Sequence, residues 1–209
     1  MSFTLRDYQV NAVDAAMTAI KKSTASLVLE LATGSGKSLV VAEIANQIRA
    51  LSGKKTLCLA PSKELVTQNF KKYISFGNPA SFWSASVGQK SVRHTAVFGT
   101  PLSVLNGIDA FKTNFACIVI DECDGISPTV KKIIQAMKTG NPNLRVIGLT
   151  ATPFRTGSGY IYKVGLDGKP MPAEQASKPY FDRLAYQIQT QELLDQGYLT
   201  RPVFSEHAD

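Results

Sequence analysis

The sequence predicts an α/β fold in which a parallel β-sheet carries helices on both faces. Two observations lead to this prediction. Short apolar runs alternate along the chain with segments whose apolar residues recur at helical spacing. Polar or glycine-containing stretches follow several of the apolar runs, as expected where parallel strands end at a common edge and bind a ligand there.

The expected elements can be taken in order. Helical spacing of Val13, Met17 and Ile20 predicts a helix over residues 8–22, and a strand follows at 25–31. A helix over 37–51 ends at Gly53, and after a strand at 55–60 another helix starts behind Ser62 as its N-cap. The later elements are strands at 80–84, 95–98, 115–120 and 144–149 and helices at 101–108 and 128–138.

The hydrophobic periodicity of the chain is lost after residue 155. Glycines and prolines interrupt residues 156–179, which predicts a loop or hairpin rather than core. A strand over 180–188 and a helix over 190–197 are expected to follow. We therefore expect residues 1–155 to form one lobe and residues 156–209 to form an extension of loop, hairpin and helix.

Composition narrows the choice of function. The chain has 209 residues, of which 44% are hydrophobic, enough for one sizeable core. A net charge of +7 favours polyanionic partners such as nucleic acid or nucleotides, although a soluble basic domain would look the same. Three unpaired cysteines and two histidines offer no zinc set, and no stretch is apolar enough for a signal or membrane span. We expect a soluble, cytoplasmic protein without a membrane partner.

The stretch Ala32-Thr33-Gly34-Ser35-Gly36-Lys37-Ser38 predicts a site for nucleotide phosphates. Glycines allow backbone N–H groups to approach the phosphate oxygens, and the start of the next helix adds partial positive charge. Lys37 supplies a full charge, and the Ser38 hydroxyl suits Mg²⁺. Leu31 stands where the strict P-loop (Walker A) pattern has its first glycine, so the match is to the looser A-x-x-G-x-G-K-S form. The competing interpretation is an ordinary turn before a helix.

Two carboxylates, Asp121 and Glu122, follow the most apolar expected strand. Hydrolysis of a phosphoanhydride needs charge neutralisation and an aligned water more than covalent help. We assign Asp121 to the metal, through water, and Glu122 to the attacking water. The alternative is a pair of solvated acids at a turn.

Taken together, these stretches resemble the motifs of the superfamily 2 helicases, in their N-terminal RecA-like lobe. Ala32–Ser38, Asp121-Glu122-Cys123-Asp124 (a DECD box) and Thr150-Ala151-Thr152-Pro153-Phe154-Arg155 are similar to motifs I, II and III. Leu5–Gln9 resembles the upstream Q-type motif, Ala60–Leu65 motif Ia and Phe98–Pro101 motif Ib. Residues 148–162 and Gly197-Tyr198-Leu199-Thr200 are similar to the RadD-like bacterial DNA-repair helicases. The fold implied is that of a P-loop NTPase.

The resemblance also implies roles for single residues. Gln9 would bind the adenine edge with Arg6 beside the base, unless both simply start a helix. Thr33 to Ser38 would hold ATP, and Asp124, Thr150 and Thr152 would couple that site to nucleic acid, unless the threonines only cap strand ends. Ser62, Lys63, Gly99 and Thr100 would contact nucleic-acid phosphates, unless they serve as helix caps and a solvated lysine. Phe82 and Trp83 could stack on bases, although a place in the core is the stronger expectation.

Some residues depart from the RNA-directed members of the superfamily. The third residue of motif II is Cys123, and motif Ia lacks the arginine usual in the RNA-directed members. This favours DNA over RNA. Such enzymes also use a second RecA-like lobe, whose arginines stabilise the developing phosphate charge, and the residues after Arg155 are too few to form it. We therefore expect a first lobe that by itself hydrolyses ATP weakly or not at all.

Two classes of function remain open. The first is the ATP-binding lobe of a DNA-dependent helicase or translocase, using ATP and Mg²⁺, in DNA repair or recombination and with repair proteins as possible partners. The second is a nucleotide-gated clamp on nucleic acid or protein that does not unwind; an RNA helicase is a further alternative. A P-loop kinase would leave residues 150–155 unexplained.

Overall fold

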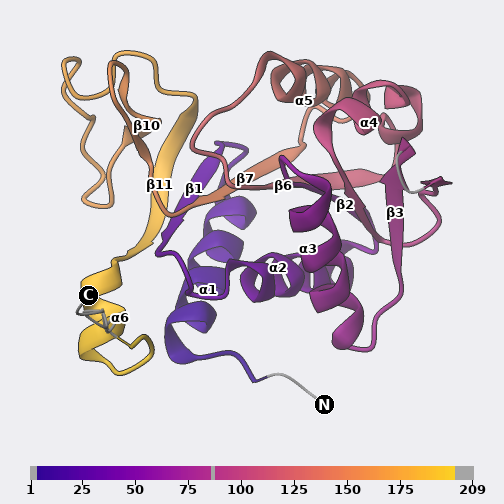
Figure 1. Cartoon of the computed structure of the whole chain (residues 1–209). Helices are drawn as coiled ribbons and strands as arrows, with labels where there is room; N and C mark the ends of the chain where they lie inside the picture. The colour runs from indigo at the N-terminus through magenta and orange to yellow at the C-terminus, as the bar shows by residue number, and fades with distance from the viewer. Residues whose placement is uncertain (1–3, 86–87, 201–209) are drawn as a thin grey trace, which may run out of the picture.

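The computed structural model describes residues 4–85 and 88–200 of the chain (Figure 1). Its helices are α1 (Asp7–Lys22), α2 (Lys37–Ser52), α3 (Lys63–Ser75), α4 (Pro101–Leu105), α5 (Pro128–Gly140) and α6 (Thr190–Asp195). Its strands are β1 (Leu27–Leu31), β2 (Lys55–Leu59), β3 (Ala80–Ser84), β4 (Gln89–Lys90), β5 (Ala96–Gly99), β6 (Phe115–Asp121), β7 (Arg145–Thr150), β8 (Phe154–Arg155), β9 (Gly159–Tyr160), β10 (Tyr162–Val164) and β11 (Phe181–Ile188). No helix in the described ranges has the length and apolarity to cross a membrane.

Within the described residues, nine strands form one sheet in the order β10-β11-β1-β7-β6-β2-β5-β3-β4. All neighbours are parallel except β3 and β4, which are antiparallel. The register places Glu30 opposite Thr150, and Asp121 opposite Leu149. Because parallel strands end at one edge, the residues that follow β1, β7, β6, β2 and β5 are brought together there.

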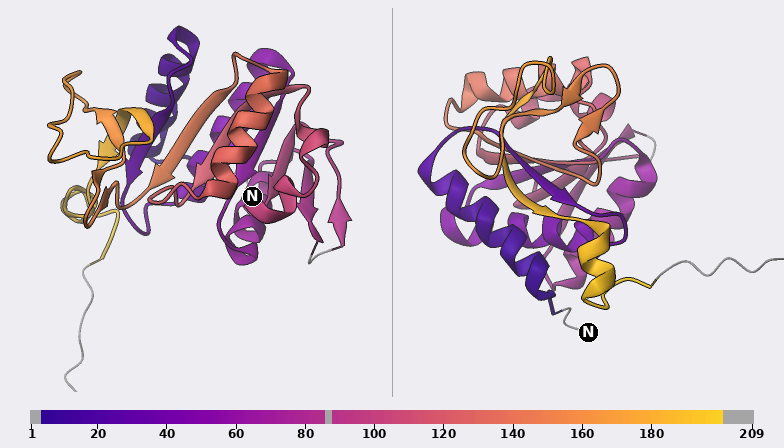
Figure 2. Two further views of the ribbon diagram at one scale, coloured as in Figure 1. Left: turned by 90° about the horizontal axis from the view of Figure 1, so that it is seen from above. Right: turned by 90° about the vertical axis from the view of Figure 1, so that its left-hand side faces the viewer.

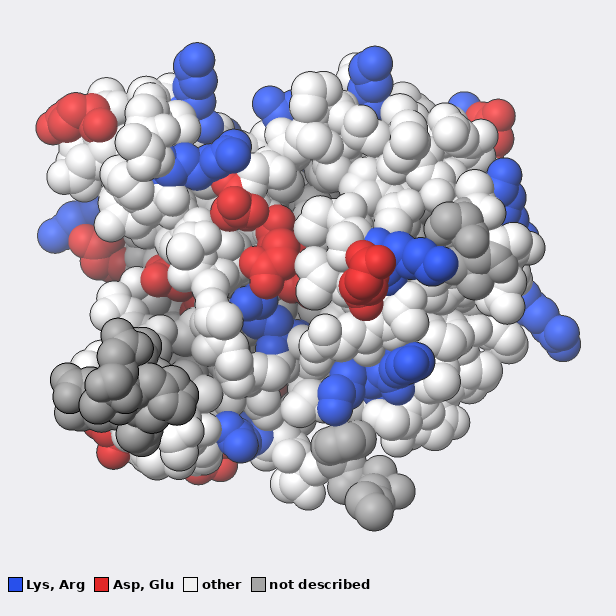
Figure 3. Space-filling view, viewed as in Figure 1, with Lys and Arg blue, Asp and Glu red and all other residues white. Residues whose placement is uncertain are grey.

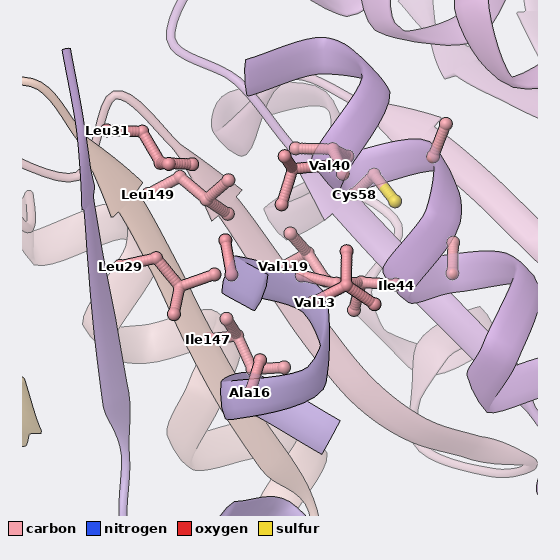
Figure 4. Close-up of a cluster of buried hydrophobic side chains, with 14 of the residues drawn as sticks. Val13, Ala16, Leu29, Leu31, Val40, Ile44, Cys58, Val119, Ile147 and Leu149 are labelled. Atoms are coloured by element: carbon pink, nitrogen blue, oxygen red, sulfur yellow. The ribbon is translucent and has the colours of Figure 1, made fainter. Parts of the chain in front are cut away.

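Helices cover both faces of the sheet, as the sequence predicted. α1, α2 and α3 lie on one face, and α4 and α5 lie on the other (Figures 1 and 2). Alternating residues along the strands supply two cores: Leu29, Leu31 and Cys58 pack with the first set of helices, and Val28 and Leu57 with the second. The close-up shows the first core, where Val13 and Ala16 of α1 meet Val40 and Ile44 of α2 over Val119, Ile147 and Leu149 (Figure 4).

Local sequence explains where the helices begin and end. Ser62 and Ser127 accept hydrogen bonds from Leu65 N and Val130 N, as N-caps do. The expected helix over 101–108 is shorter, since α4 ends at Leu105 and a 3₁₀ turn follows at Ile108–Phe111. The sequence did not predict β4, whose two residues carry no strand pattern.

The chain after residue 155 returns to the same sheet. β8 and β9 form a separate antiparallel hairpin, but β10 joins the main sheet and Ile161 and Tyr162 are buried in its core, contrary to the expectation that residues 156–179 lie outside the core. β11 pairs with β1 and is the second strand from one edge of the sheet. Asp182 secures this pairing by accepting hydrogen bonds from Ser26 N at 2.8 Å and from Lys163 Nζ at 2.9 Å. Burial alone would raise the pKa of Asp182, but the hydrogen bonds from Lys163 and Ser26 outweigh it and lower the pKa.

Candidate nucleotide-binding site

The ends of β1 and β6 border a cavity of about 370 Å³. Its walls contain most of the residues predicted to bind nucleotide, and Figure 3 shows acidic and basic side chains side by side at the centre of this face. The lining residues are Thr33, Gly34, Gly36, Lys37, Ser38, Leu39, Leu65, Gln68, Lys72, Asp121 and Glu122. The tertiary structure therefore brings together two segments that lie far apart in the sequence.

The glycine loop reaches the cavity because of its backbone conformation. Gly36 has φ = 78° and precedes α2 as its N-cap, which leaves Lys37 and Ser38 in the first turn of that helix. A Cβ at Gly36 would lie 2.7 Å from Nε2 of Gln9, closer than real Cβ contacts come. The left-handed backbone therefore favours glycine at residue 36, and any side chain there would also have to displace the Gln9 amide.

Lys37 and Glu122 face each other across the cavity. The ammonium of Lys37 lies 3.1 Å from Oε1 of Glu122, and the Lys37 side chain is only 11% exposed. Glu122 has φ = 51°, a left-handed conformation that is uncommon for a residue with a side chain. This turn directs Glu122 into the cavity directly after β6. Sequence reasoning predicted the meeting of these groups but not the strained backbone at Glu122.

Asp121 is buried, with 5% of its surface exposed, and each of its carboxylate oxygens accepts one hydrogen bond. Asn69 Nδ2 donates to Oδ2 at 2.8 Å, and Glu122 N donates to Oδ1 at 3.0 Å. Burial raises the pKa of Asp121; the hydrogen bond from Asn69 opposes that rise, the charge of Glu122 adds to it, and the charge of Lys37 opposes it. The carboxylate is therefore held in one orientation at the edge of the cavity.

Asn69 was missed by the sequence analysis. It is 3% exposed on the inward face of α3, with Val66 and Tyr73 one turn to either side. A polar residue on the apolar stripe of a helix was the available signal, because such a side chain needs a buried partner. The sequence could not identify that partner as Asp121.

The donors present suit Mg²⁺. The hydroxyl of Ser38 and the carboxylate of Asp121 line the same cavity, and hard oxygen donors are those that Mg²⁺ prefers. In the described ranges, no group of three or more His, Cys, Asp or Glu side chains could hold a metal ion. Mg²⁺ is often held by one or two protein oxygens together with substrate phosphates and water.

Gln9, Arg6 and Ser35 lie beside the cavity rather than on its walls. Gln9 is 2% exposed; it accepts a hydrogen bond from Arg6 N at 2.9 Å and donates to the carbonyl of Ser35 at 2.8 Å. Tyr8 Oη donates to the same carbonyl at 2.7 Å. The guanidinium of Arg6 lies 5.1 Å from the ring centroid of Tyr198, so the two ends of the described chain meet beside the glycine loop.

The residues predicted to bind nucleic acid lie at the ends of β2 and β5. Leu59 and Gly99 are opposite each other in the register, so Ser62 with Lys63 and Thr100 follow neighbouring strand ends. The hydroxyl of Thr100 donates to Ser103 Oγ at 3.0 Å. Trp83 donates from Nε1 to the carbonyl of Ser103 and packs edge-on to Phe111, and Phe82 is buried, consistent with a place in the core for both.

The predicted coupling residues are divided between two environments. Thr150 is fully buried, and its hydroxyl accepts a hydrogen bond from Thr152 N at 3.0 Å. Asp124 lies on the other side of the motif II turn, in a groove that it shares with Arg155. Within the described residues no hydrogen bond joins Asp124 to either threonine.

Comparison with known proteins identifies the family of the chain. Residues 2–155 match the family described as Type III restriction enzyme, res subunit. The chain belongs to this family. Two proteins similar to this chain are named as helicases. IRC3 of Saccharomyces cerevisiae is 24% identical over 96% of this chain. The ATP-dependent DNA helicase mph1 of Sclerotinia sclerotiorum is 30% identical over 61% of this chain. The chain spans 29% and 12% of the lengths of these two proteins.

The fold of this chain is similar to that of a solved helicase structure. The UvsW helicase of bacteriophage T4 is similar with a TM-score of 0.62 and 18% identity, over 88% of this chain and 60% of that one. A likeness at this identity bears on the fold alone. Together with the nine-stranded sheet and its flanking helices, it establishes a helicase-like RecA fold of the P-loop NTPase class.

Proposed function

We propose that the chain is the N-terminal ATP-binding lobe of a superfamily 2 ATPase, a helicase or translocase that acts on DNA. The observation that supports this best is the 3.1 Å pair between Lys37 and Glu122, which joins the glycine loop to the carboxylates after β6. A turn that only stabilised the fold would need neither the left-handed Gly36 nor the strained Glu122 at this edge. Membership of the res-subunit family and the helicase names of two relatives support the same class.

Each residue has a definite task in this proposal. Hydrolysis of ATP joins a water oxygen to the terminal phosphorus and breaks its bond to the bridging oxygen. Lys37 offsets the charge on the phosphates, and Glu122 orients the water and accepts its proton. Ser38 and Asp121 would hold Mg²⁺, which neutralises phosphate charge when it is bound. Gln9 and Arg6, beside Ser35, would select the adenine base.

The finer parts of the proposal concern the partner and the cell. The printed name of mph1 as a DNA helicase and Cys123 in motif II favour DNA over RNA, whereas the positive net charge suits either nucleic acid. We propose a cytoplasmic DNA-repair or recombination role of the RadD-like type, with a second RecA-like lobe as the partner of this one. No arginine of the described residues lines the cavity. We therefore expect slow ATP turnover by residues 1–209 alone, because an arginine at the phosphates contributes about 10³–10⁵ in rate in related enzymes.

Two substitutions test the nucleotide site. Lys37→Ala should weaken binding of a fluorescent ATP analogue about tenfold or more, because it removes a charge-assisted contact. Glu122→Gln should leave nucleotide binding within about threefold while reducing the DNA-stimulated ATP turnover of the full-length protein by about 10²–10⁴. Lys132→Ala, an exposed lysine on α5, is the control for loss of a charge. Normal nucleotide binding by Lys37→Ala would refute the proposed site, and normal turnover by Glu122→Gln would refute the role of Glu122.

A further inference from the structure

A second hollow lies beside motif II, away from the nucleotide cavity. It is a groove of about 190 Å³ between the turn at Cys123–Ile126, the first turn of α5 and the segment around β8 and β9. Three cations reach it from three separate segments: Lys131 from α5, Arg155 from β8, and Lys178 from the loop before β11. Asp124 is the one acidic residue in its lining, so the groove carries a positive balance.

The charges of these cations are not neutralised by ion pairs with the residues that the structure describes. No hydrogen bond or ion pair joins the side chains of Arg155 or Lys178 to any residue that the structure describes. The ammonium of Lys131 lies 5.5 Å from the ring centroid of Tyr180, a contact that leaves its N–H donors available. Unpaired cations that converge on one hollow raise the local positive potential and favour an anionic ligand.

The guanidinium of Arg155 lies against Gly125. A Cβ at Gly125 would lie 2.9 Å from its Nη1 and 3.0 Å from its Cζ, so the guanidinium rests against the bare backbone of Gly125. A planar group held by one face presents its N–H edges outward, which is the geometry for bidentate contact with a phosphate.

The groove adjoins a second cavity at the ends of β2 and β5, since Gly125 lines both. Gly125 also lines a smaller cavity of about 90 Å³, whose other walls include Pro61, Pro101 and Ser127. Pro61 precedes Ser62, and Pro101 follows Thr100, two of the residues assigned to nucleic acid. Figure 3 shows Lys and Arg side chains on both rims of the hollow between the β10 region and α5, above the central acidic group.

We infer that the groove of Lys131, Arg155 and Lys178 binds the phosphate backbone of a nucleic-acid strand that extends from the ends of β2 and β5 past Ser127. This inference rests on the proposed function, which makes nucleic acid the partner, and it joins Arg155 of motif III to Lys131 and Lys178, which lie outside the helicase-like motifs. Phosphate contacts of this kind carry no base sequence information, so the groove positions the strand.

The test compares two triple variants with equal net charge. The groove variant is Lys131→Gln, Arg155→Gln and Lys178→Gln; the control is Lys21→Gln, Lys132→Gln and Lys138→Gln, which removes three exposed lysines outside the groove. Binding of labelled single-stranded and duplex oligonucleotides is measured from about 50 to 200 mM salt. We expect the groove variant to bind single strands about 10–100-fold more weakly and to flatten the log–log salt slope by about 2, at roughly 0.7 per phosphate contact. The control should lose about threefold or less.

The outcomes separate the groove from the function. If the groove variant binds like the control while Lys63→Ala binds more weakly, the groove inference is overturned and the proposed function stands. If the unmodified chain binds neither oligonucleotide, both are overturned. Arg155→Lys keeps the positive charge but loses the planar guanidinium with its paired N–H donors, so it should weaken oligonucleotide binding several-fold. Unchanged binding would refute bidentate contact. Binding of a fluorescent ADP analogue checks the fold of every variant.

Discussion

Replacement of Asn69 by alanine should destabilise the protein through the charge of Asp121. The amide is the donor to Oδ2 of Asp121, at 2.8 Å, and both residues are almost fully buried. Hydrogen bonds to charged groups contribute about 1.5–3 kcal/mol. For a chain of this size 1 kcal/mol shifts the melting temperature by about 2–4 °C, so Asn69→Ala should melt about 3–12 °C lower.

The effect should depend on pH in a predictable direction. The pKa of Asp121 lies above the ordinary value of 3.8, so the native state binds a proton more readily than the unfolded chain between these two values. Stability therefore falls as pH rises through that interval. Loss of Asn69 removes a hydrogen bond that lowers the pKa, and so it increases this penalty. The loss of stability caused by Asn69→Ala should be greatest at neutral pH and should shrink as Asp121 becomes protonated.

Thermal melts of four proteins measure the interaction. They are the unmodified chain, Asn69→Ala, Asp121→Asn and the double variant. This double-mutant cycle gives the coupling energy between Asn69 and Asp121. Asn143→Ala, at an exposed residue, is the control and should change stability by about 0.5 kcal/mol or less. A coupling energy near zero, or a deficit that stays the same from neutral to acid pH, would show that Asn69 does not act through the Asp121 carboxylate.

Three further substitutions test other parts of the structure. Gly36→Ala should lower both the melting temperature and nucleotide affinity, because a left-handed backbone costs about 1–2 kcal/mol and the new Cβ meets Gln9; unchanged nucleotide binding would contradict this. Tyr198→Ala should cost about 1–2.5 kcal/mol in a melt by removing the ring beside Arg6, whereas Tyr198→Phe should cost little; equal losses would refute the ring contact. Asp182→Asn should destabilise by about 1 kcal/mol or less at neutral pH, as its site is partly exposed. Its lowered pKa means that this contribution is lost as pH falls below 3.8, so melts at acid pH should converge.

Much of the fold was predictable because its signals are local. Hydrophobic periodicity placed the first strand, the helix after the glycine loop and the strand before Asp121 close to their observed bounds. Ser62 identified the start of α3 through the chemistry of an N-cap. The short strands β8, β9 and β10, between residues 154 and 164, were harder to predict, since two- and three-residue strands carry no period and depend on their neighbours in the sheet.

The sequence by itself determined that a glycine loop and a pair of carboxylates would follow parallel strands, and therefore that Lys37 and Glu122 would share one edge. Only the tertiary structure decided which side chains surround them. Asn69 beneath Asp121, Tyr198 beside Arg6, and the three cations around Gly125 come from segments with no common pattern. The physical reason is that a strand or helix is specified by neighbours along the chain, whereas hydrogen-bond partners and charge clusters arise when distant segments pack.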